Sequence, residues 1–129
     1  MKSELRTDRV YRTSGPYGQA VEVKGGKLIF TSGFLGRGLD GQLVDKSDVA
    51  AQTRQCIENV RLTLEAAGGS LKDLVRLNVI ITHPRNYDAM NAVRKEMLSG
   101  IAFTSVTTVG QLIDPHGLVE IDAVAAIGS

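Results

Sequence analysis

Five stretches of the chain are rich in apolar and β-branched residues and are bounded by turn residues, a pattern that predicts β-strands. They span residues 19–23, 27–32, 74–82, 104–109 and 118–127. In the last stretch the odd-numbered positions from Val119 to Ala125 share one apolar face, because side chains alternate along a strand. Glu120 and Asp122 fall on the opposite face.

Glycine marks the connections between these strands. Lys24, Gly25 and Gly26 separate the first two, and since glycine accepts positive φ angles, we expect a hairpin turn there. Residues 33–46 hold four glycines with little periodicity, which indicates a loop or an irregular hairpin. The pattern also leaves room for a short extra strand before Gly15.

Another stretch, between the second and third predicted strands, repeats apolar positions at intervals of three, four and seven residues. This pattern predicts a helix with one core-facing side. The apolar stripe consists of Val49, Cys56, Ile57, Val60 and Leu64. We expect the Ser47 hydroxyl to cap the start of this helix. Gly68 and Gly69 are expected to end it.

A second helix is predicted from about Tyr87 to Leu98, with Asn86 or Asp88 near its start. The elements then follow the order β-β-α-β-α-β-β in a single domain of residues 1–129. Two helices against a five- to six-stranded mixed sheet fit an α/β (α+β) two-layer sandwich with both helices on one face. The other face would stay bare, so we expect it to pack against other subunits.

Charge and aromatic content argue against a nucleic-acid partner. The 129 residues include 15 Lys and Arg against 14 Asp and Glu, a formal charge of +1. Proteins that bind nucleic acids usually carry a clear basic excess. The chain has no Trp and only 5% aromatic residues, too few for an extensive base-stacking platform.

The sequence also carries no signal for a cofactor, a metal or a membrane. Cys56 is the only cysteine, which excludes an intrachain disulfide and a cysteine-ligated zinc site. The glycine-rich residues 33–38 do not match the dinucleotide-binding pattern GxGxxG. No apolar run suits a membrane span or a secretory signal. We therefore expect a cytoplasmic protein without metal or cofactor.

Glu120 is the strongest candidate for chemistry. It interrupts an otherwise apolar strand, where burying a carboxylate without a partner is costly. It is either a solvated or paired strand carboxylate, or a general base that positions water. Asp122 points to the same side, and we expect it to pair with a cation or to contact a neighbouring subunit.

Two turn segments offer further candidates. Tyr17 follows Gly15-Pro16 and is either a packing tyrosine in a rigid loop or a hydroxyl for a ligand. Ser32 and Gly33 stand at the end of a buried strand. They offer a hydroxyl and an accessible backbone amide to a ligand, or they simply begin the following loop.

Six short motifs are spread over nearly the whole chain. They are Gly15-Pro16-Tyr17-Gly18-Gln19 (similar to GPYSQ), residues 30–33 (FTSGQ), residues 58–60 (ENV) before Ala66-Ala67-Gly68, residues 77–82 (VTVFLTD), residues 90–93 (NEVY) and residues 119–125 (VEIEAIA). In this order they resemble the YjgF/RidA family of reactive-intermediate deaminases, also known as L-PSP endoribonucleases.

The resemblance implies a chorismate-mutase-like fold and a homotrimer with clefts between its subunits. It also implies hydrolysis of imines and enamines derived from amino acids to 2-oxo acids and ammonia. In that chemistry the strand glutamate, here Glu120, orients the attacking water. Other cleft positions of the family are matched by Tyr17, Ser32, Gly33, Asn91 and Ser105.

The chain departs from the family pattern at the arginine that binds the substrate carboxylate. Residues 101–106 match the pattern P-x-R-[ST]-x-V, and Phe103 stands in the arginine position. Phenylalanine has no donor, so a charged hydrogen bond of about 1.5–3 kcal/mol is missing. A standard 2-imino acid is therefore not the expected substrate.

Three interpretations follow. In the first, the protein hydrolyses a different, neutral or aromatic substrate, and Phe103 forms an apolar wall. In the second, Arg94 supplies the missing cation, since it lies three residues after Asn91 on the same helix face. In the third, the cleft binds a small-molecule ligand or has a regulatory role without catalysis. An endoribonuclease or translation inhibitor, the fourth class, fits the near-neutral charge least well.

Overall fold

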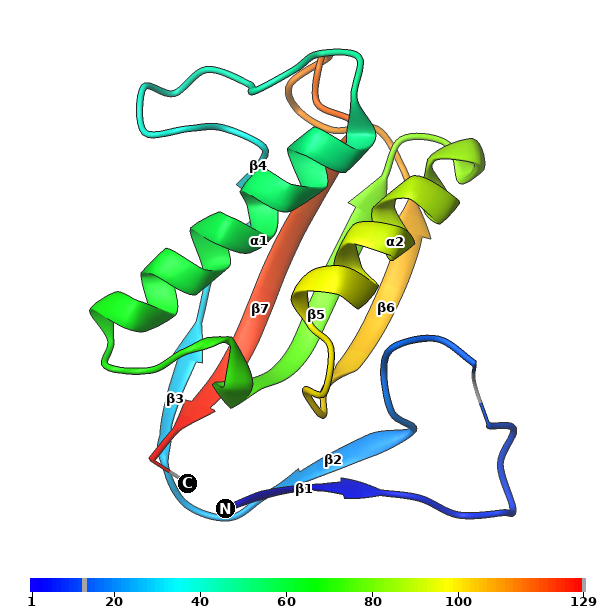
Figure 1. The fold of residues 1–129 in the computed structure, drawn as a ribbon, viewed down its shortest axis with the longest axis vertical. Helices are drawn as coiled ribbons and strands as arrows, with labels where there is room; N and C mark the ends of the chain where they lie inside the picture. The colour runs from blue at the N-terminus through cyan, green and yellow to red at the C-terminus, as the bar shows by residue number, and fades with distance from the viewer. Residues whose placement is uncertain (13, 129) are drawn as a thin grey trace.

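Two helices pack on one face of a mixed β-sheet in the computed structural model, which describes residues 1–12 and 14–128 (Figure 1). The helices are α1 (Val49–Ala66) and α2 (Tyr87–Met97). The strands are β1 (Lys2–Leu5), β2 (Ala20–Val23), β3 (Lys27–Phe30), β4 (Phe34–Leu35), β5 (Leu74–Ile81), β6 (Thr104–Val109) and β7 (Val119–Ile127). Short 3-10 helices, Leu71–Asp73 and Pro84–Asn86, precede β5 and α2.

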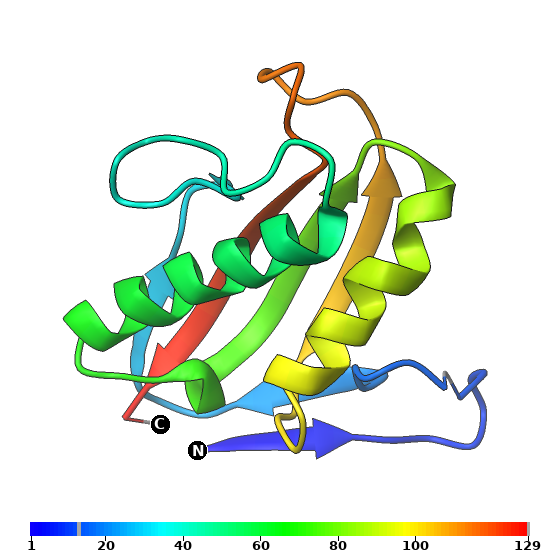
Figure 2. The same ribbon diagram turned by 45° about the horizontal axis from the view of Figure 1, so that its top comes forward.

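The main sheet has five strands in the order β3-β7-β5-β6, with β4 also paired to β7. β5 and β6 are parallel, whereas β7 runs antiparallel to β3, β4 and β5. Figure 2 shows both helices on the same side of this sheet. The predicted two-layer α+β architecture, with a mixed sheet and one covered face, is therefore confirmed.

The predicted hairpin between residues 19–23 and 27–32 is wrong, although the turn itself forms. Gly25 and Gly26 have φ angles of 74° and 95°, as expected for glycine in a turn. However, β2 pairs with β1, and β3 pairs with β7 in the main sheet. The reason is that β1 occupies the edge of β2, so the chain turns a corner at the glycines and enters a different sheet (Figure 1).

The start of α1 lies one residue later than predicted. The side chain of Asp48, not that of Ser47, accepts the hydrogen bond from the Ala51 amide, at 3.1 Å. The Ser47 hydroxyl instead donates to the Asp45 carboxylate at 2.9 Å. A carboxylate caps as well as a hydroxyl, and Asp48 stands three residues before the free amide. At the other end, Gly68 adopts a φ of 88°, as predicted for a helix terminator.

The start of α2 is organised by the residues before it. The Nδ1 atom of His83 accepts from the Arg85 amide at 3.1 Å and caps the short 3-10 helix that leads into α2. Asn86 takes the predicted position at the start of α2 but forms no side-chain capping bond. Asp88 lies inside the first turn, where its negative charge suits the positive end of the helix dipole.

The core lies between the helices and the sheet. The predicted apolar stripe of α1 is buried from Cys56 to Leu64, and so are Val119 to Ala125 at the odd positions of β7. The opposite face of the sheet is uncovered, with Leu28 54% exposed and Phe30 70% exposed. No helix in the described part of the chain is long and apolar enough to cross a membrane.

Candidate functional site

Glu120 lies on β7, where this strand pairs with β4 near one edge of the sheet. It contributes to a hollow of about 530 Å³ that is also lined by Gly33, Arg37 and Asn59. Among the described residues, none forms a hydrogen bond or ion pair with the Glu120 carboxylate. The fold thus presents a half-buried carboxylate to an open hollow without supplying a partner.

The segment between β3 and β4 brings Gly33 to this hollow. Thr31 holds the segment against β7 through two hydrogen bonds with Ala123, at 2.9 and 3.0 Å. Gly33 then lies against the Glu120 side chain so closely that a Cβ atom there would be 2.7 Å from Oε2. A larger residue at this position would displace the Glu120 carboxylate from its place in the hollow. Ser32 is exposed beside it.

A second polar group surrounds Arg94 at the opposite edge of the sheet. Its guanidinium donates to Asn91 Oδ1 from Nε (3.1 Å) and from Nη2 (2.8 Å). It also donates to Ser105 Oγ (2.8 Å) and, over longer distances, to Thr107 Oγ1 (3.4 Å) and the Tyr87 hydroxyl (3.3 Å). We call Arg94, Asn91, Ser105, Thr107 and Tyr87 the Arg94 cluster. These bonds occupy all five N–H donors of the guanidinium.

Aromatic rings complete the surroundings of Arg94. The Tyr17 ring lies 5.1 Å from the guanidinium carbon and the Tyr87 ring 6.0 Å from it, both within cation–π range. The Arg94 residue is 0% exposed, and no carboxylate pairs with it among the described residues. Burial lowers the pKa of the Arg94 guanidinium, and the two tyrosines act in the opposite direction.

Phe103 does not face a hollow. Its side chain is 0% exposed and belongs to the hydrophobic core, so in the single chain it provides no apolar wall for a ligand. Its backbone carbonyl accepts a hydrogen bond from the Gly18 amide at 2.9 Å. The residue therefore anchors the loop that carries Tyr17 beside the start of β6.

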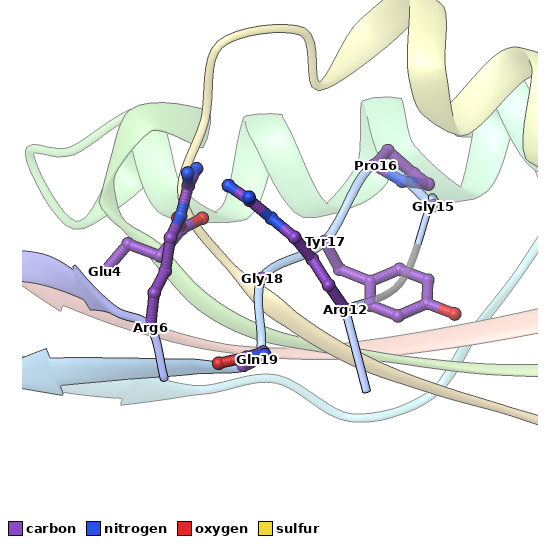
Figure 3. Close-up of a pocket in the computed structure, with 8 residues that line it drawn as sticks. All are labelled: Glu4, Arg6, Arg12, Gly15, Pro16, Tyr17, Gly18 and Gln19. Carbon is purple, nitrogen blue, oxygen red and sulfur yellow. The ribbon is translucent and has the colours of Figure 1, made fainter. Parts of the chain in front are cut away.

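Two hollows adjoin Tyr17. The smaller one, of about 190 Å³, is lined by Arg6, Arg12 and Gly18. Figure 3 shows the guanidinium groups of Arg6 and Arg12 on the same side of the Gly18 backbone, with the Tyr17 hydroxyl pointing away from them. The larger one, of about 530 Å³, lies between β2 and the first residues of β5 and β6.

The predicted site residues thus fall into two groups within one chain. Tyr17, Asn91, Arg94 and Ser105 lie together, and Ser32, Gly33 and Glu120 lie together. Ser105 and Thr107 face α2, whereas Glu120 is on the alternate positions of β7 that face away from the helices. The two groups therefore occupy opposite faces of the sheet.

Asp122 has a hydrogen-bond partner within the chain, and two residues that the sequence did not single out contact Arg94. Asp122 accepts a hydrogen bond from Asn78 Nδ2 at 3.2 Å, so an amide of the neighbouring strand is its partner in this chain. Tyr87 and Thr107 belong to the Arg94 cluster but were not predicted. Their spacings of seven residues from Arg94 on α2 and two from Ser105 on β6 were the available signals.

The described residues contain no group of His, Cys, Asp and Glu side chains that could hold a metal ion. Fold and site together define a class: a two-layer α+β protein with a strand carboxylate that has no partner among the described residues on the uncovered face of the sheet, and a buried arginine cluster between the sheet and α2. The family model described as Endoribonuclease L-PSP matches residues 7–127, and the chain belongs to this family, the YjgF/RidA family.

Individual relatives support this assignment. A RutC family protein of Pyrococcus horikoshii is 31% identical over 97% of this chain and 98% of its own length. Protein mmf2, mitochondrial, of Schizosaccharomyces pombe is 41% identical over 87% of this chain and 88% of its own length. The crystal structure of YyfB from Yersinia pestis, a protein of unknown function of the conserved Rid family, superposes with a TM-score of 0.86 at 27% identity and covers 98% of both chains.

Proposed function

We propose that this protein hydrolyses imines or enamines of a small metabolite in clefts between the subunits of a homotrimer. The observation that carries the proposal is the Glu120 carboxylate, which is half-buried, unpaired among the described residues and open to a hollow. Such a carboxylate is suited to accept a proton from water, because Arg37, the cation that lines the same hollow, is paired with Asp114 and not with Glu120. Family membership supports the same chemistry.

The reaction balances with water alone. As the water oxygen bonds to the imine carbon, a water proton passes to Glu120 and the C=N π-electron pair moves to nitrogen. The carboxyl group then returns the proton to nitrogen. The hydroxyl proton of this intermediate then passes to nitrogen as the C–N bond breaks and the C=O bond forms. Ammonia and a carbonyl compound are released, so neither an oxidant nor a cofactor is consumed.

The position of the two polar groups supports a cleft between copies of the chain. Within one chain, Glu120 and Ser105 lie on opposite faces of the sheet, so they cannot contact the same small molecule. The two groups can share a small molecule only if a second copy brings the edge of its sheet that carries Tyr17 and Ser105 to Glu120 of the first copy. The exposed Leu28 and Phe30 side chains on the uncovered face are consistent with such packing.

The test is hydrolysis of imines generated in situ, with the parent and Glu120→Gln compared. We expect a loss in kcat of at least about 100-fold, because glutamine keeps the shape of the side chain but cannot accept the proton. Glu22→Gln, at an exposed carboxylate on β2, is the matched control and should leave the rate unchanged. Equal activity of Glu120→Gln and the parent would refute the proposal.

A non-catalytic binding or regulatory role is the second candidate. It is favoured by one observation: every N–H donor of Arg94 is already used within the chain, so the Arg94 cluster offers no free guanidinium donor to a substrate. Under this alternative, Glu120→Gln would retain its ligand and neither variant nor parent would release ammonia. Cleavage of RNA by the parent, abolished by added salt, would instead favour the endoribonuclease role.

A further inference from the structure

The hollow into which Glu120 opens is lined by three parts of the chain. They are β4, the side of α1 that carries Asn59 and Leu62, and residues 37–41 of the loop that follows β4. Figure 1 and Figure 2 show this loop on the side of α1 away from α2. We call this space the Glu120 hollow. It is separate from the two hollows beside Tyr17, because it shares none of its described lining residues with them.

The loop that forms one wall of the Glu120 hollow is fixed to α1. Gly36 packs so closely on the helix that a Cβ atom there would be 2.7 Å from the Cα atom of Gln52. The Asn59 side chain donates from Nδ2 to the carbonyl oxygens of Leu35 and Arg37, at 3.4 and 3.0 Å. The walls are therefore formed before a ligand binds, which keeps the entropic cost of binding low.

The neutral polar side chains of this hollow already have partners within the chain. Gln55 donates from Nε2 to Asn59 Oδ1 at 2.9 Å, and the Thr63 hydroxyl donates to the Asn59 carbonyl oxygen at 2.8 Å. The Oε1 atom of Gln55 accepts no hydrogen bond from the described residues. An acceptor is thus left free on the helix wall.

The charge balance of the hollow is negative. Arg37 lines it, but its guanidinium is paired with the Asp114 carboxylate at 2.6 Å and also donates to the Gly41 carbonyl oxygen at 2.8 Å. The Glu120 carboxylate has no such partner among the described residues. A ligand with a carboxylate of its own would be repelled there, whereas an N–H group is attracted.

Apolar side chains form much of the remaining surface. Leu62 on α1 is 48% exposed and Leu39 on the loop is fully exposed, and both line the hollow together with Phe34 and Leu35 of β4. Covering exposed apolar surface of this kind is favourable. The leucine walls and the free acceptors together suit a ligand that joins an alkyl group to an N–H group.

We propose that the Glu120 hollow binds the alkyl substituent of the substrate, and that the substrate is an imine without a carboxylate. This inference rests on the proposed function and specifies its substrate class. One oxygen of the Glu120 carboxylate accepts from the N–H group of the imine, and the other remains available to water. Leu39 and Leu62 cover the alkyl group from the two walls. Hydrolysis consumes one water and releases ammonia and an aldehyde or ketone.

The experiment compares three ligands by NMR titration of the protein: isopentylammonium, ethylammonium and leucine. Ethylammonium lacks most of the alkyl group, and leucine differs from isopentylammonium only by a carboxylate. We expect isopentylammonium to bind at least about 10-fold more tightly than either of the other two. Burial of the alkyl group favours it over ethylammonium, and the absence of repulsion from Glu120 favours it over leucine.

Leu62→Ala shortens the helix wall and should weaken isopentylammonium binding about 3- to 10-fold, while ethylammonium binding changes less than about twofold. Leu39→Ala, on the loop wall, should act in the same way. Leu5→Ala is the matched control, because Leu5 on β1 is also 48% exposed and lies outside the hollow. Glu120→Gln should weaken both ammonium ligands alike, since it removes the charge and leaves the walls in place.

Hydrolysis is followed in parallel with imines generated by oxidation of isopentylamine and of leucine. We expect a higher kcat/KM for the imine without a carboxylate. In Leu62→Ala the KM for this imine should rise with little change in kcat, because the alkyl contact contributes equally to substrate and transition state. Thermal unfolding and light scattering of each variant show whether it is folded and whether its molecular mass is unchanged.

The inference is overturned if leucine binds as tightly as isopentylammonium, or if Leu62→Ala and Leu5→Ala have equal effects. A changed molecular mass of Leu62→Ala would also overturn it, by assigning Leu62 to a contact between copies. Binding of isopentylammonium that depends on Leu62, without hydrolysis of either imine, would refute the proposed function and retain the binding hollow. Hydrolysis that favours the leucine-derived imine and is unchanged in Leu62→Ala would retain the proposed function and refute this substrate class.

Discussion

Arg94, on α2 beside the edge strand β6, and Glu120, on the inner strand β7, lie on opposite faces of one sheet, and the fold treats the two charges in opposite ways. The guanidinium of Arg94 is 0% exposed and has five hydrogen bonds and two aromatic rings around it. The carboxylate of Glu120 is accessible from a hollow of about 530 Å³ and has no such bond with the described residues.

The difference indicates which of the two charged side chains is available to a ligand and which one holds its neighbours in place. A buried charge whose donors are all satisfied holds its neighbours in fixed positions, and displacing them would cost several hydrogen bonds. An unsatisfied charge at a hollow is available to water or a ligand. The comparison therefore assigns reactivity to the Glu120 side and a positioning role to the Arg94 cluster, and the following predictions test this division.

The largest effect is expected from Phe103→Arg. A sequence comparison would treat this change as restoring the family arginine, but the Phe103 side chain is fully buried in the core. Loss of the ring and burial of an unpaired cation should lower the free energy of unfolding by about 4 kcal/mol or more. Urea denaturation measures this, with Phe103→Leu as a control that loses about 1 kcal/mol. A stable, folded Phe103→Arg protein would show that position 103 can open to solvent.

Arg94→Met tests the positioning role of the Arg94 cluster. Methionine preserves most of the volume but removes the charge and all donors to Asn91, Ser105 and Tyr87. We expect the free energy of unfolding to fall by about 2–3 kcal/mol, because several buried acceptors lose their donors together. Arg94→Lys should lose less. If Arg94→Met were as stable as the parent, the buried charge would be serving a ligand instead of the fold.

The sequence predicted the helices and strands better than it predicted which strands pair with each other. The apolar periodicity of α1 and β7 identified their buried faces, because burial of those faces is what the period reflects. The turn at Gly25 and Gly26 was also predictable, yet the strand pairing was not. Pairing depends on long-range contacts, here those of β1, about which a local turn carries no information.

The candidate site shows the same limit. Glu120 could be identified because a carboxylate within an apolar strand is locally unusual. Thr107 could not, since a threonine in a β-branched strand looks like an ordinary strand residue until its contact with Arg94 is known. Phe103 was assigned to the cleft by its motif position, whereas its burial depends on the packing of the helices.

Gly33→Ala tests whether the position of the Glu120 carboxylate in its hollow matters for activity, without removing the carboxylate. The added Cβ would lie 2.7 Å from Oε2, so the side chain of Glu120 must move away from its place in the hollow. We expect kcat for imine hydrolysis to fall about 10- to 100-fold with little change in stability, because the displaced atoms are the end of a flexible side chain. Gly110→Ala is the control, as its nearest neighbour would be 3.8 Å away. Equal kcat values for both variants would contradict the placement of the reactive group.

The smallest effect is expected from the ionisation of Cys56. This residue lies on the face of α1 that packs against β4 and β7, and its Sγ contacts the Phe34 carbonyl oxygen at 3.2 Å. Burial, and to a lesser extent the negative charge of Glu120, raises the pKa of the Cys56 thiol from 9.0 to about 12. The unfolded chain loses this proton from about pH 9 upwards while the folded chain retains it, so stability falls as the pH rises towards 12.

Between pH 8 and pH 10 the thiol should lower the free energy of unfolding by about 1 kcal/mol relative to Cys56→Ala, which has no titrating group there. Urea denaturation at both pH values gives the difference, and comparison with the alanine variant removes the contribution of lysines and tyrosines. Parallel pH dependence of the two proteins would mean that the thiol ionises as easily in the folded chain as in the unfolded one. Repeating the comparison with Glu120→Gln should reduce the slope slightly, because the carboxylate beside the hollow contributes to the pKa of the thiol beneath it.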